Sequence, residues 1–206
     1  MYIALEGVVG TGKTTQATKL YEFLKLKFPN KKVILTREPG GTQIAENIRK
    51  IVQGTEYNEE MDVVCEAYLY AAARAQSLRK IVKPVLDSGG IVVSDRTFLS
   101  SLAYQGFVRS NINLILDINK KAIEGFYPDT ILFLDLDPKK GLMRTFDKDG
   151  DKWEKLDVTF FEKVKEGYLE ISKMPEFSKK WINIDATGNI NDVFFRIKNK
   201  IMEILP

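Results

Sequence analysis

Residues 7–14 read Gly7-Val8-Val9-Gly10-Thr11-Gly12-Lys13-Thr14 and match the pattern G-x-x-x-x-G-K-[ST] of a phosphate-binding loop. The apolar run Tyr2–Leu5 precedes the motif, and a helical pattern with Ala17, Leu20 and Leu24 on one face follows it. Glycines let the backbone curl so that successive N–H groups point at phosphate oxygens, and the start of the helix adds its dipole. The motif therefore predicts a loop that binds the phosphates of a nucleotide.

Two side chains of the motif carry chemistry. Lys13 is expected to reach the β- and γ-phosphates of ATP, and the hydroxyl of Thr14 is expected to hold Mg²⁺. A strand–turn–helix connection that binds nothing is the plain alternative. It does not account for the lysine, the threonine and the flanking pattern together.

The rest of the chain alternates short apolar runs with longer helical patterns. Four further runs are predicted to be strands: Val33–Thr36, Ile91–Val93, Thr130–Leu134 and Trp181–Ile184. Such alternation favours right-handed βαβ crossovers. We therefore predict an α/β fold, the three-layer α/β/α architecture of P-loop NTPases, with a five-stranded parallel sheet covered by helices on both faces. At 206 residues we expect a single P-loop domain over 1–206.

Several local features refine this prediction. The alanine-rich stretch from Asp62 to Leu86 is expected to form one long, mostly buried helix, and Thr42 is expected to cap a helix through Ile44, Ile48 and Ile51. The polar segment at about 144–155 is expected to be a mobile lid, with the basic residues Arg144, Lys148 and Lys152. These three side chains would either contact phosphate or form a solvated face.

The composition excludes several kinds of site. The chain has no histidine, which rules out a Ser-His-Asp triad, a Cys-His dyad and a histidine-ligated zinc. Cys65 is the single cysteine, so no internal disulfide can form. Lys and Arg total 31 against 28 Asp and Glu, too even a balance to indicate a nucleic-acid partner. Without a basic leader or an apolar run of about 18 residues, we expect a cytoplasmic protein that does not enter a membrane.

Charged residues follow the predicted strands, where an open α/β sheet binds its ligands. Asp95 ends the third run and is either a support for Mg²⁺ or the N-cap of a helix, whereas Asp137 before Pro138 is expected to be a cap. Together with Lys13 and Asp95, Arg96 is a candidate for the catalytic group.

These features favour a kinase that acts on a nucleoside monophosphate. A switch GTPase is disfavoured, because the nearest base-reading candidate, Asn119-Lys120-Lys121-Ala122, lacks the aspartate. A phosphate acceptor is already an anion at neutral pH, since its second pKa is about 6, and so it needs no general base. It needs cations that offset repulsion between phosphates, and four arginines would supply them: Arg37, Arg49, Arg74 and Arg96.

Several blocks of sequence carry a resemblance to a known family. They are Leu5-Glu6-Gly7, Lys13-Thr14-Thr15-Gln16, Arg37-Glu38-Pro39-Gly40-Gly41-Thr42, Asp95-Arg96, Ser100-Ser101-Leu102-Ala103-Tyr104-Gln105-Gly106, Tyr127-Pro128-Asp129 and Gly167-Tyr168-Leu169. Together they resemble the bacterial thymidylate kinases along essentially the whole chain. The resemblance implies transfer of a phosphoryl group from ATP to dTMP with Mg²⁺, in a homodimer, with Gly7–Thr15 on ATP.

The resemblance also implies roles at the base and sugar. Tyr70 would stack on thymine, and Arg74, one helical turn later, would read the base. Ser101 and Gln105 would turn toward the base, and Tyr104 would lie under the deoxyribose and crowd out a 2′-hydroxyl. For Tyr70 a core aromatic is the plain alternative, and Tyr104 could equally be a packed core tyrosine.

Further residues would bind the acceptor phosphate or shape the pocket. By the same resemblance, Arg49, Arg96 and Arg37 would contact the phosphate, and Pro39, next to Glu38, would shape the base pocket. On residue type alone, an arginine on a helix is more often a solvated side chain.

The chain departs from the family's pattern in two places. Val9 stands where the family usually has Asp or Glu near the 3′-hydroxyl, which predicts weaker selection at the 3′ position or weaker dTMP binding. The lid carries Lys148 and Lys152 where bacterial members usually place arginines, and lysine offers a point charge instead of a bidentate fork. Two rival functions therefore stay open: a kinase for another deoxynucleotide or nucleoside, and a nucleotide-binding regulator that transfers nothing.

Overall fold

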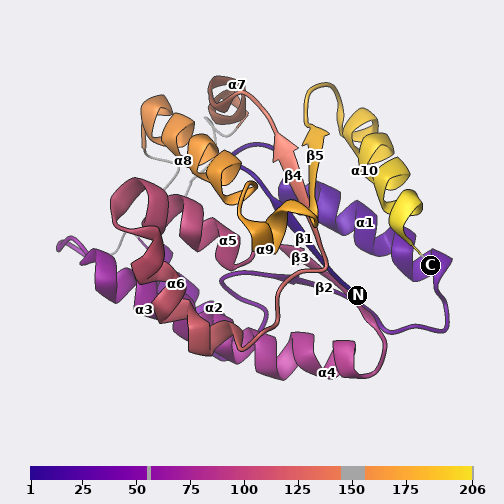
Figure 1. Cartoon of the computed structure of the whole chain (residues 1–206), viewed down its shortest axis with the longest axis horizontal. Helices are drawn as coiled ribbons and strands as arrows, with labels where there is room; N and C mark the ends of the chain where they lie inside the picture. Colours follow the sequence, from indigo (N-terminus) through magenta and orange to yellow (C-terminus); the bar gives the residue numbers. More distant parts are fainter. Residues whose placement is uncertain (55–56, 145–155, 206) are drawn as a thin grey trace.

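The sheet has the predicted architecture. In the computed structural model, which describes residues 1–54, 57–144 and 156–205, five parallel strands form one sheet in the order β2-β3-β1-β4-β5 (Figure 1). The strands are β1 (Tyr2–Glu6), β2 (Val33–Arg37), β3 (Ile91–Asp95), β4 (Thr130–Asp135) and β5 (Trp181–Asp185). Each extends one or two residues beyond its predicted end and finishes on a charged residue. Because the strands are parallel, these charges gather at one edge.

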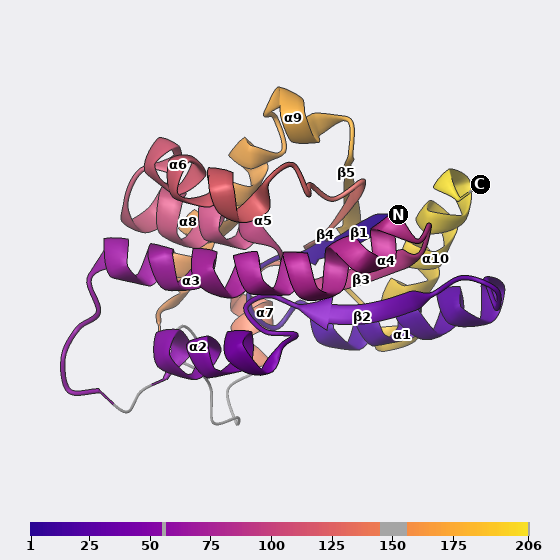
Figure 2. The ribbon, with the colours of Figure 1, turned by 90° about the horizontal axis from the view of Figure 1, so that it is seen from below.

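Two helices cover one face of the sheet. They are α1 (Lys13–Lys27) and α10 (Ile190–Ile204), which pack on alternate strand residues such as Leu5 and Leu132 (Figures 1 and 2). The buried stripe of α1 includes the predicted Ala17, Leu20 and Leu24. The apolar side of the helices, which repeats every 3.6 residues, thus packs on the apolar side of the strands, which repeats every second residue.

The other face carries five further helices. They are α3 (Val63–Ser77), α4 (Lys83–Asp87), α5 (Phe98–Ser101), α6 (Ile112–Ile123) and α8 (Val158–Ile171). Two short helices connect strands to this layer, α7 (Pro138–Met143) after β4 and α9 (Pro175–Ser178) before β5. The three-layer prediction is therefore confirmed.

The predicted long helix is present but not uniform. Asp62 caps its start, and α3 continues through a π-helical stretch, Leu78–Val82, into α4. The prediction that it is mostly buried is wrong for its outer side, where Val64, Tyr68 and Ala72 are exposed. A second π-helical stretch, Leu102–Phe107, follows α5. Such stretches often occur at functional sites.

Helix α2 (Gln43–Gln53) begins where predicted but turns another side inward. The Thr42 side chain caps it by accepting from the Ala45 N–H at 3.1 Å. Its buried residues are Ala45 and Val52, whereas Ile44 and Ile51 are 56% and 40% exposed. The inward side of α2 therefore carries Ala45 and Val52, and Ile44 and Ile51 lie outside.

The phosphate-binding loop is pressed against α7. Gly10 has a φ of 68°, and a Cβ built on it would lie 1.9 Å from the carbonyl oxygen of Gly141. Both the backbone conformation and the close approach require glycine here. The loop therefore has its shape before any ligand binds.

Candidate active site

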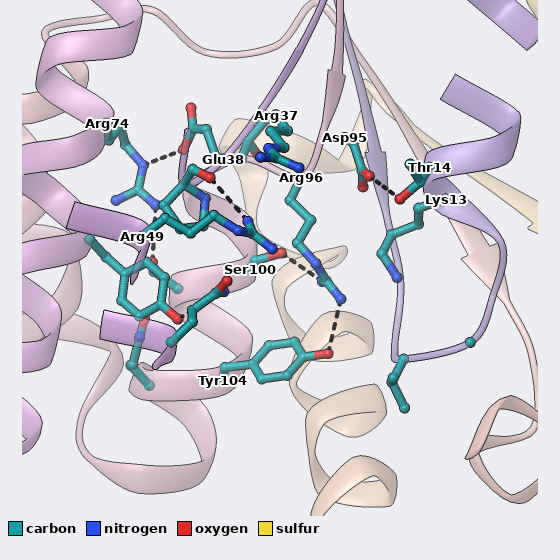
Figure 3. A pocket seen from close by; sticks show the side chains of 18 of the residues that line it. Lys13, Thr14, Arg37, Glu38, Arg49, Arg74, Asp95, Arg96, Ser100 and Tyr104 are labelled. Atoms are coloured by element: carbon teal, nitrogen blue, oxygen red, sulfur yellow. Dashed lines mark hydrogen bonds and ion pairs between the residues drawn. The ribbon is translucent and has the colours of Figure 1, made fainter. Parts of the chain in front are cut away.

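One cavity of about 350 Å³ lies at the edge of the sheet where the strands end. At one end it is lined by the phosphate-binding loop and at the other by α3 and the π-helical stretch after α5 (Figure 3). Every residue predicted to bind the acceptor lines it: Arg37, Glu38, Pro39, Arg49, Tyr70, Arg74, Arg96, Ser101, Tyr104 and Gln105. Residues about 70 positions apart in the sequence thus share one space.

The loop end is organised around Lys13. Its Nζ donates to the Val8 carbonyl at 2.6 Å and to Thr11 Oγ1 at 3.2 Å, and Thr11 Oγ1 donates to the same carbonyl at 3.1 Å. Lys13, at the start of α1, is buried although it lines the cavity. A phosphate entering the loop would offer this ammonium a charged partner in place of the carbonyl.

Thr14 and Asp95 lie against each other across the cavity. The hydroxyl of Thr14 donates to Asp95 Oδ2 at 2.5 Å (Figure 3). Asp95 is not the N-cap of α5, because Thr97 has that place and accepts from the Leu99 N–H. The cap alternative for Asp95 is therefore wrong, whereas Asp137 does cap α7, as predicted.

Arg96 lies between the two ends of the cavity. Its Nη1 donates to the Gly7 carbonyl at 3.1 Å and to Ser100 Oγ at 3.0 Å, and its Nη2 donates to Tyr104 Oη at 3.3 Å. Its φ of 72° is unusual for a side-chain-bearing residue and is held by these contacts. Burial by itself would lower the pKa of Arg96, but Tyr104, Tyr168, Glu6 and Asp95 together raise it, so the guanidinium stays charged.

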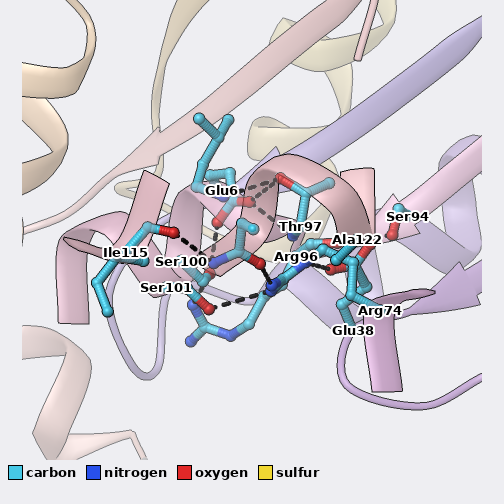
Figure 4. A network of polar contacts seen from close by, with 12 residues as sticks. Glu6, Glu38, Arg74, Ser94, Arg96, Thr97, Ser100, Ser101, Ile115 and Ala122 are labelled. Carbon is cyan, nitrogen blue, oxygen red and sulfur yellow. Dashed lines mark hydrogen bonds and ion pairs between the residues drawn. The ribbon is translucent and has the colours of Figure 1, made fainter. Parts of the chain in front are cut away.

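Beneath Arg96 lies a fully buried carboxylate, Glu6. Its Oε1 accepts from both the backbone N–H and the hydroxyl of Thr97 at 2.7 Å, and its Oε2 accepts from Ser100 at 2.7 Å (Figure 4). Oε2 also accepts from Tyr168 Oη at 2.9 Å. Burial raises the pKa of Glu6, and the Arg96 charge and these hydrogen bonds offset part of that rise. The network joins β1, the segment after β3 and α8.

The far end of the cavity is built around Arg74. Its Nε donates to Glu38 Oε2 at 2.7 Å, its Nη2 donates to Ser101 Oγ at 3.0 Å, and its Nη1 donates to Asn119 Oδ1 (Figure 4). The pair of Arg74 and Glu38 is buried. Burial raises the pKa of Glu38 and the neighbouring Arg74 opposes the rise. Ser101 thus holds the arginine as well as lining the pocket.

The remaining acceptor-site residues form the walls. The Tyr70 hydroxyl accepts from Gln53 Nε2 at 3.3 Å, and the Arg96 guanidinium lies 5.2 Å from the centre of the Tyr104 ring. Arg49 Nη1 donates to the Pro39 carbonyl at 3.0 Å. Both tyrosines line the cavity, so they are not purely core aromatics.

Arg37 and the lid residues lie less close to this arrangement. Arg37 is half exposed and forms a salt bridge of 2.6 Å with Glu46, which lowers the pKa of that carboxyl. Arg144 is exposed, with Nη1 3.5 Å from the Gly10 carbonyl. Lys148 and Lys152 lie outside the described residues. Val9 presents an apolar side chain to the cavity.

Sequence reasoning missed the residues that support the site from behind. Glu6 carried one signal, a charge at the end of an apolar strand immediately before the loop. Asn119 and Glu66 carried none, because they touch the site only through contacts between distant parts of the chain. Asn119 was weighed only as a base-reading element of a GTPase, and it instead accepts from Arg74.

Comparisons with known proteins agree with this geometry. Residues 5–197 match the family model described as "Thymidylate kinase". The chain is similar to curated thymidylate kinases from Geobacillus sp. (strain WCH70), 46% identical over 94% of this chain and 91% of the relative, and from Finegoldia magna, 45% identical over 94% of each. Among solved structures it is similar to a thymidylate kinase from Ehrlichia chaffeensis, with a TM-score of 0.78, 30% identity and 98% of each chain covered.

Glu6 gives a pH-dependent test of the buried network. Because its pKa is raised, Glu6 holds its proton more tightly in the folded protein than in the unfolded chain. Its protonation therefore stabilises the folded protein fully below about pH 4.5, the ordinary pKa of a glutamate. This stabilisation is lost as the pH rises through the raised pKa. The free energy of unfolding of the wild type minus that of Glu6→Gln should therefore fall from pH 4.5 upward. Urea unfolding at a series of pH values measures this difference in the free energy of unfolding. A difference that rises with pH contradicts a raised pKa for Glu6.

Proposed function

The chain belongs to the thymidylate kinase family, and on that premise we propose how the residues of its cavity carry out the reaction. The enzyme transfers the γ-phosphoryl group of ATP to dTMP and releases dTDP and ADP. One observation supports the assignment of residues more than any other: a single cavity runs from the phosphate-binding loop to Arg74 (Figure 3). We place the enzyme in the cytoplasm, where ATP and free deoxynucleotides are found.

ATP binds with its phosphates in the loop. The backbone N–H groups of Gly7–Thr15, including those at the start of α1, donate hydrogen bonds to the phosphate oxygens. Lys13 exchanges the Val8 carbonyl for the β- and γ-phosphates, a stronger, charge-assisted contact. Arg144, next to Gly10, contacts the same phosphates. We assign the same role to Lys148 and Lys152, which lie outside the described residues.

Thr14 and Asp95 fit a magnesium ion. A hydroxyl and a carboxylate oxygen, 2.5 Å apart, are the hard oxygen ligands that Mg²⁺ takes together with nucleotide phosphates. When bound, the ion offsets charge on the β- and γ-phosphates. The chain itself supplies the orientation, because the side chains come from α1 and from the end of β3.

dTMP binds in the other half of the cavity. Tyr70 stacks on the base, and Arg74 with Ser101 and Gln105 faces its edge. Tyr104 lies beneath the sugar and excludes a 2′-hydroxyl. Glu38 holds Arg74 in place through the buried salt bridge, and Pro39 closes the pocket next to it.

Transfer needs charge and alignment but no general base. The acceptor phosphate is a dianion at neutral pH, since its second pKa is about 6. Arg96 reaches both the Gly7 carbonyl and the Tyr104 hydroxyl, so it lies where the two phosphates meet. Arg49 and Arg37 bring further positive charge from the α2 side. These cations offset the repulsion that otherwise keeps the two anions apart.

The acceptor range tests the assignment directly. ADP formation from MgATP should be rapid with dTMP, slower with dUMP, and at least about tenfold lower with UMP, whose 2′-hydroxyl meets Tyr104. AMP and thymidine should give no turnover, since neither presents both the right base and the acceptor phosphate. A preference for another acceptor, or ATP binding with no transfer, contradicts the assignment.

The same assay with 3′-deoxy-dTMP tests Val9. A valine cannot accept a hydrogen bond from the 3′-hydroxyl, a partner worth about 1 kcal/mol. Removing that hydroxyl should therefore change kcat/KM by less than about tenfold. A stronger preference for the hydroxyl means that another group binds it.

The magnesium assignment predicts a shift in metal dependence. Asp95→Asn should raise the Mg²⁺ concentration for half-maximal activity by about tenfold or more, because the ion loses a charged ligand. Asp137→Asn is the matched control: Asp137 also follows a strand of the sheet, β4, but caps α7, and asparagine caps equally well. Equal metal dependence in both variants overturns the assignment.

We further propose that the enzyme is a homodimer joined through the outer side of α3. Val64, Tyr68 and Ala72 are exposed at intervals of four residues and form an apolar stripe along this helix. The opposite side of the same helix carries Tyr70 and Arg74. A partner packed on the stripe would thus brace the helix that forms the base pocket.

The dimer predicts a mass in solution of about twice 23.5 kDa. Tyr68→Arg should lower it to the mass of one chain, because a charge replaces an apolar contact. Phe195→Arg, at a side chain that is 64% exposed on α10, is the control and should leave the mass unchanged. Light scattering after gel filtration measures both, and a wild type that elutes as one chain contradicts the proposal.

A further inference from the structure

The side-chain amide of Gln105 is oriented from behind. Gln105 lines the cavity, is 1% exposed, and donates from Nε2 to Glu66 Oε1 at 3.0 Å. A carboxylate accepts hydrogen bonds and has none to donate, so the amide nitrogen must be the atom that faces Glu66. The amide oxygen is therefore the atom left for other partners.

That oxygen is a buried hydrogen-bond acceptor without a donor among the residues that the structure describes. Gln105 Oε1 has no hydrogen-bond partner within residues 1–54, 57–144 and 156–205. Buried polar atoms are nearly always satisfied, and an unsatisfied one at a binding site points to a ligand that completes it. Since Gln105 lines the cavity, a nucleotide bound there can supply the missing donor.

Glu66 is well placed to hold this orientation. It is fully buried, and its other oxygen, Oε2, accepts from Arg109 Nη1 at 2.9 Å, so a charged partner compensates for its burial. Glu66 lies four and eight residues before Tyr70 and Arg74, on the same side of α3. Orientation of Gln105 and placement of the other base-facing residues thus come from one helix face.

Arg74 offers the complementary group. A guanidinium has five N–H donors, and Arg74 uses three of them on described residues, Glu38, Asn119 and Ser101. Two N–H groups are left for a ligand, in a residue that lines the same cavity. The base pocket therefore presents donors from Arg74 and an acceptor from Gln105.

We propose that Glu66 is a specificity-determining positioning residue. By holding the Gln105 amide with its oxygen toward the cavity, it makes the pocket complementary to a base edge with an N–H beside a carbonyl. Thymine has that edge, with N3–H beside C4=O, whereas cytosine has a ring acceptor beside an amino group. This inference rests on the proposed roles of Gln105 and Arg74 at the base.

The test is the selectivity between dTMP and dCMP. In Glu66→Gln the new amide can donate or accept, so the Gln105 amide is free to turn its nitrogen toward the cavity. The ratio of kcat/KM for dTMP to that for dCMP should fall by about tenfold or more, with kcat/KM for dCMP unchanged or raised. A merely structural role would lower both values together and leave the ratio unchanged.

Glu60→Gln is the matched control. Glu60 lies 3.9 Å from the same Arg109 but is 92% exposed at its side chain and lies in the loop before α3. Its variant should keep the wild-type ratio. If Glu66→Gln fails to fold, Gln105→Met carries the test, because it removes the acceptor at similar volume and should also lower the ratio.

The outcomes separate this inference from the proposed function. A wild type that phosphorylates dTMP while Glu66→Gln, or Gln105→Met in its place, keeps the wild-type ratio overturns the inference and leaves the function intact. A wild type with no dTMP turnover overturns the proposed function itself. A lowered ratio in Glu66→Gln, with the ratio of Glu60→Gln unchanged, supports the inference.

Discussion

The buried carboxylate of Glu6 is the constraint on which the rest of the site depends. It ends β1, immediately before the phosphate-binding loop, and accepts hydrogen bonds from Thr97, Ser100 and Tyr168. These contacts join β1, the segment after β3 and α8 at one point under the loop. Burying a carboxylate is costly unless its oxygens are satisfied, so these donors cannot be lost singly without strain on the rest. Arg96, which shares Ser100 and Tyr168, takes its place from this network.

The topology then converts local placement into a continuous cavity. With β3 and β4 on either side of β1, the ends of neighbouring parallel strands surround the loop. The Arg96 N–H donates to the Leu5 carbonyl, which extends the β1–β3 pairing into the segment that follows β3. Long helix α3 runs along the other end and presents Tyr70 and Arg74 from successive turns. The phosphate-binding loop and the residues of α3 therefore line one cavity, which also holds the charged side chains of Lys13, Arg96 and Arg74.

Much of this was predictable from the sequence, for physical reasons. The loop motif, the five strands and the capping by Thr42 depend on neighbouring residues, and the structure confirms them. The inward side of α2 was not predictable from its isoleucines, because contacts with the rest of the fold bury Ala45 and Val52 instead. Glu66 and Asn119 were invisible for a related reason: each acts through a contact made 39 or 45 residues away. Contacts between side chains so far apart in the sequence form only when the whole chain has folded.

The central claim is that ATP and dTMP occupy one cavity with their phosphates facing. A dinucleotide in which adenosine and thymidine are joined 5′ to 5′ by a chain of phosphates tests it most directly. Measured by calorimetry, it should bind more tightly than either ATP or dTMP alone and should displace both, because linking the halves makes the second binding event intramolecular. A ligand that displaces only one nucleotide, or binds no more tightly than the better of the two, would contradict the claim.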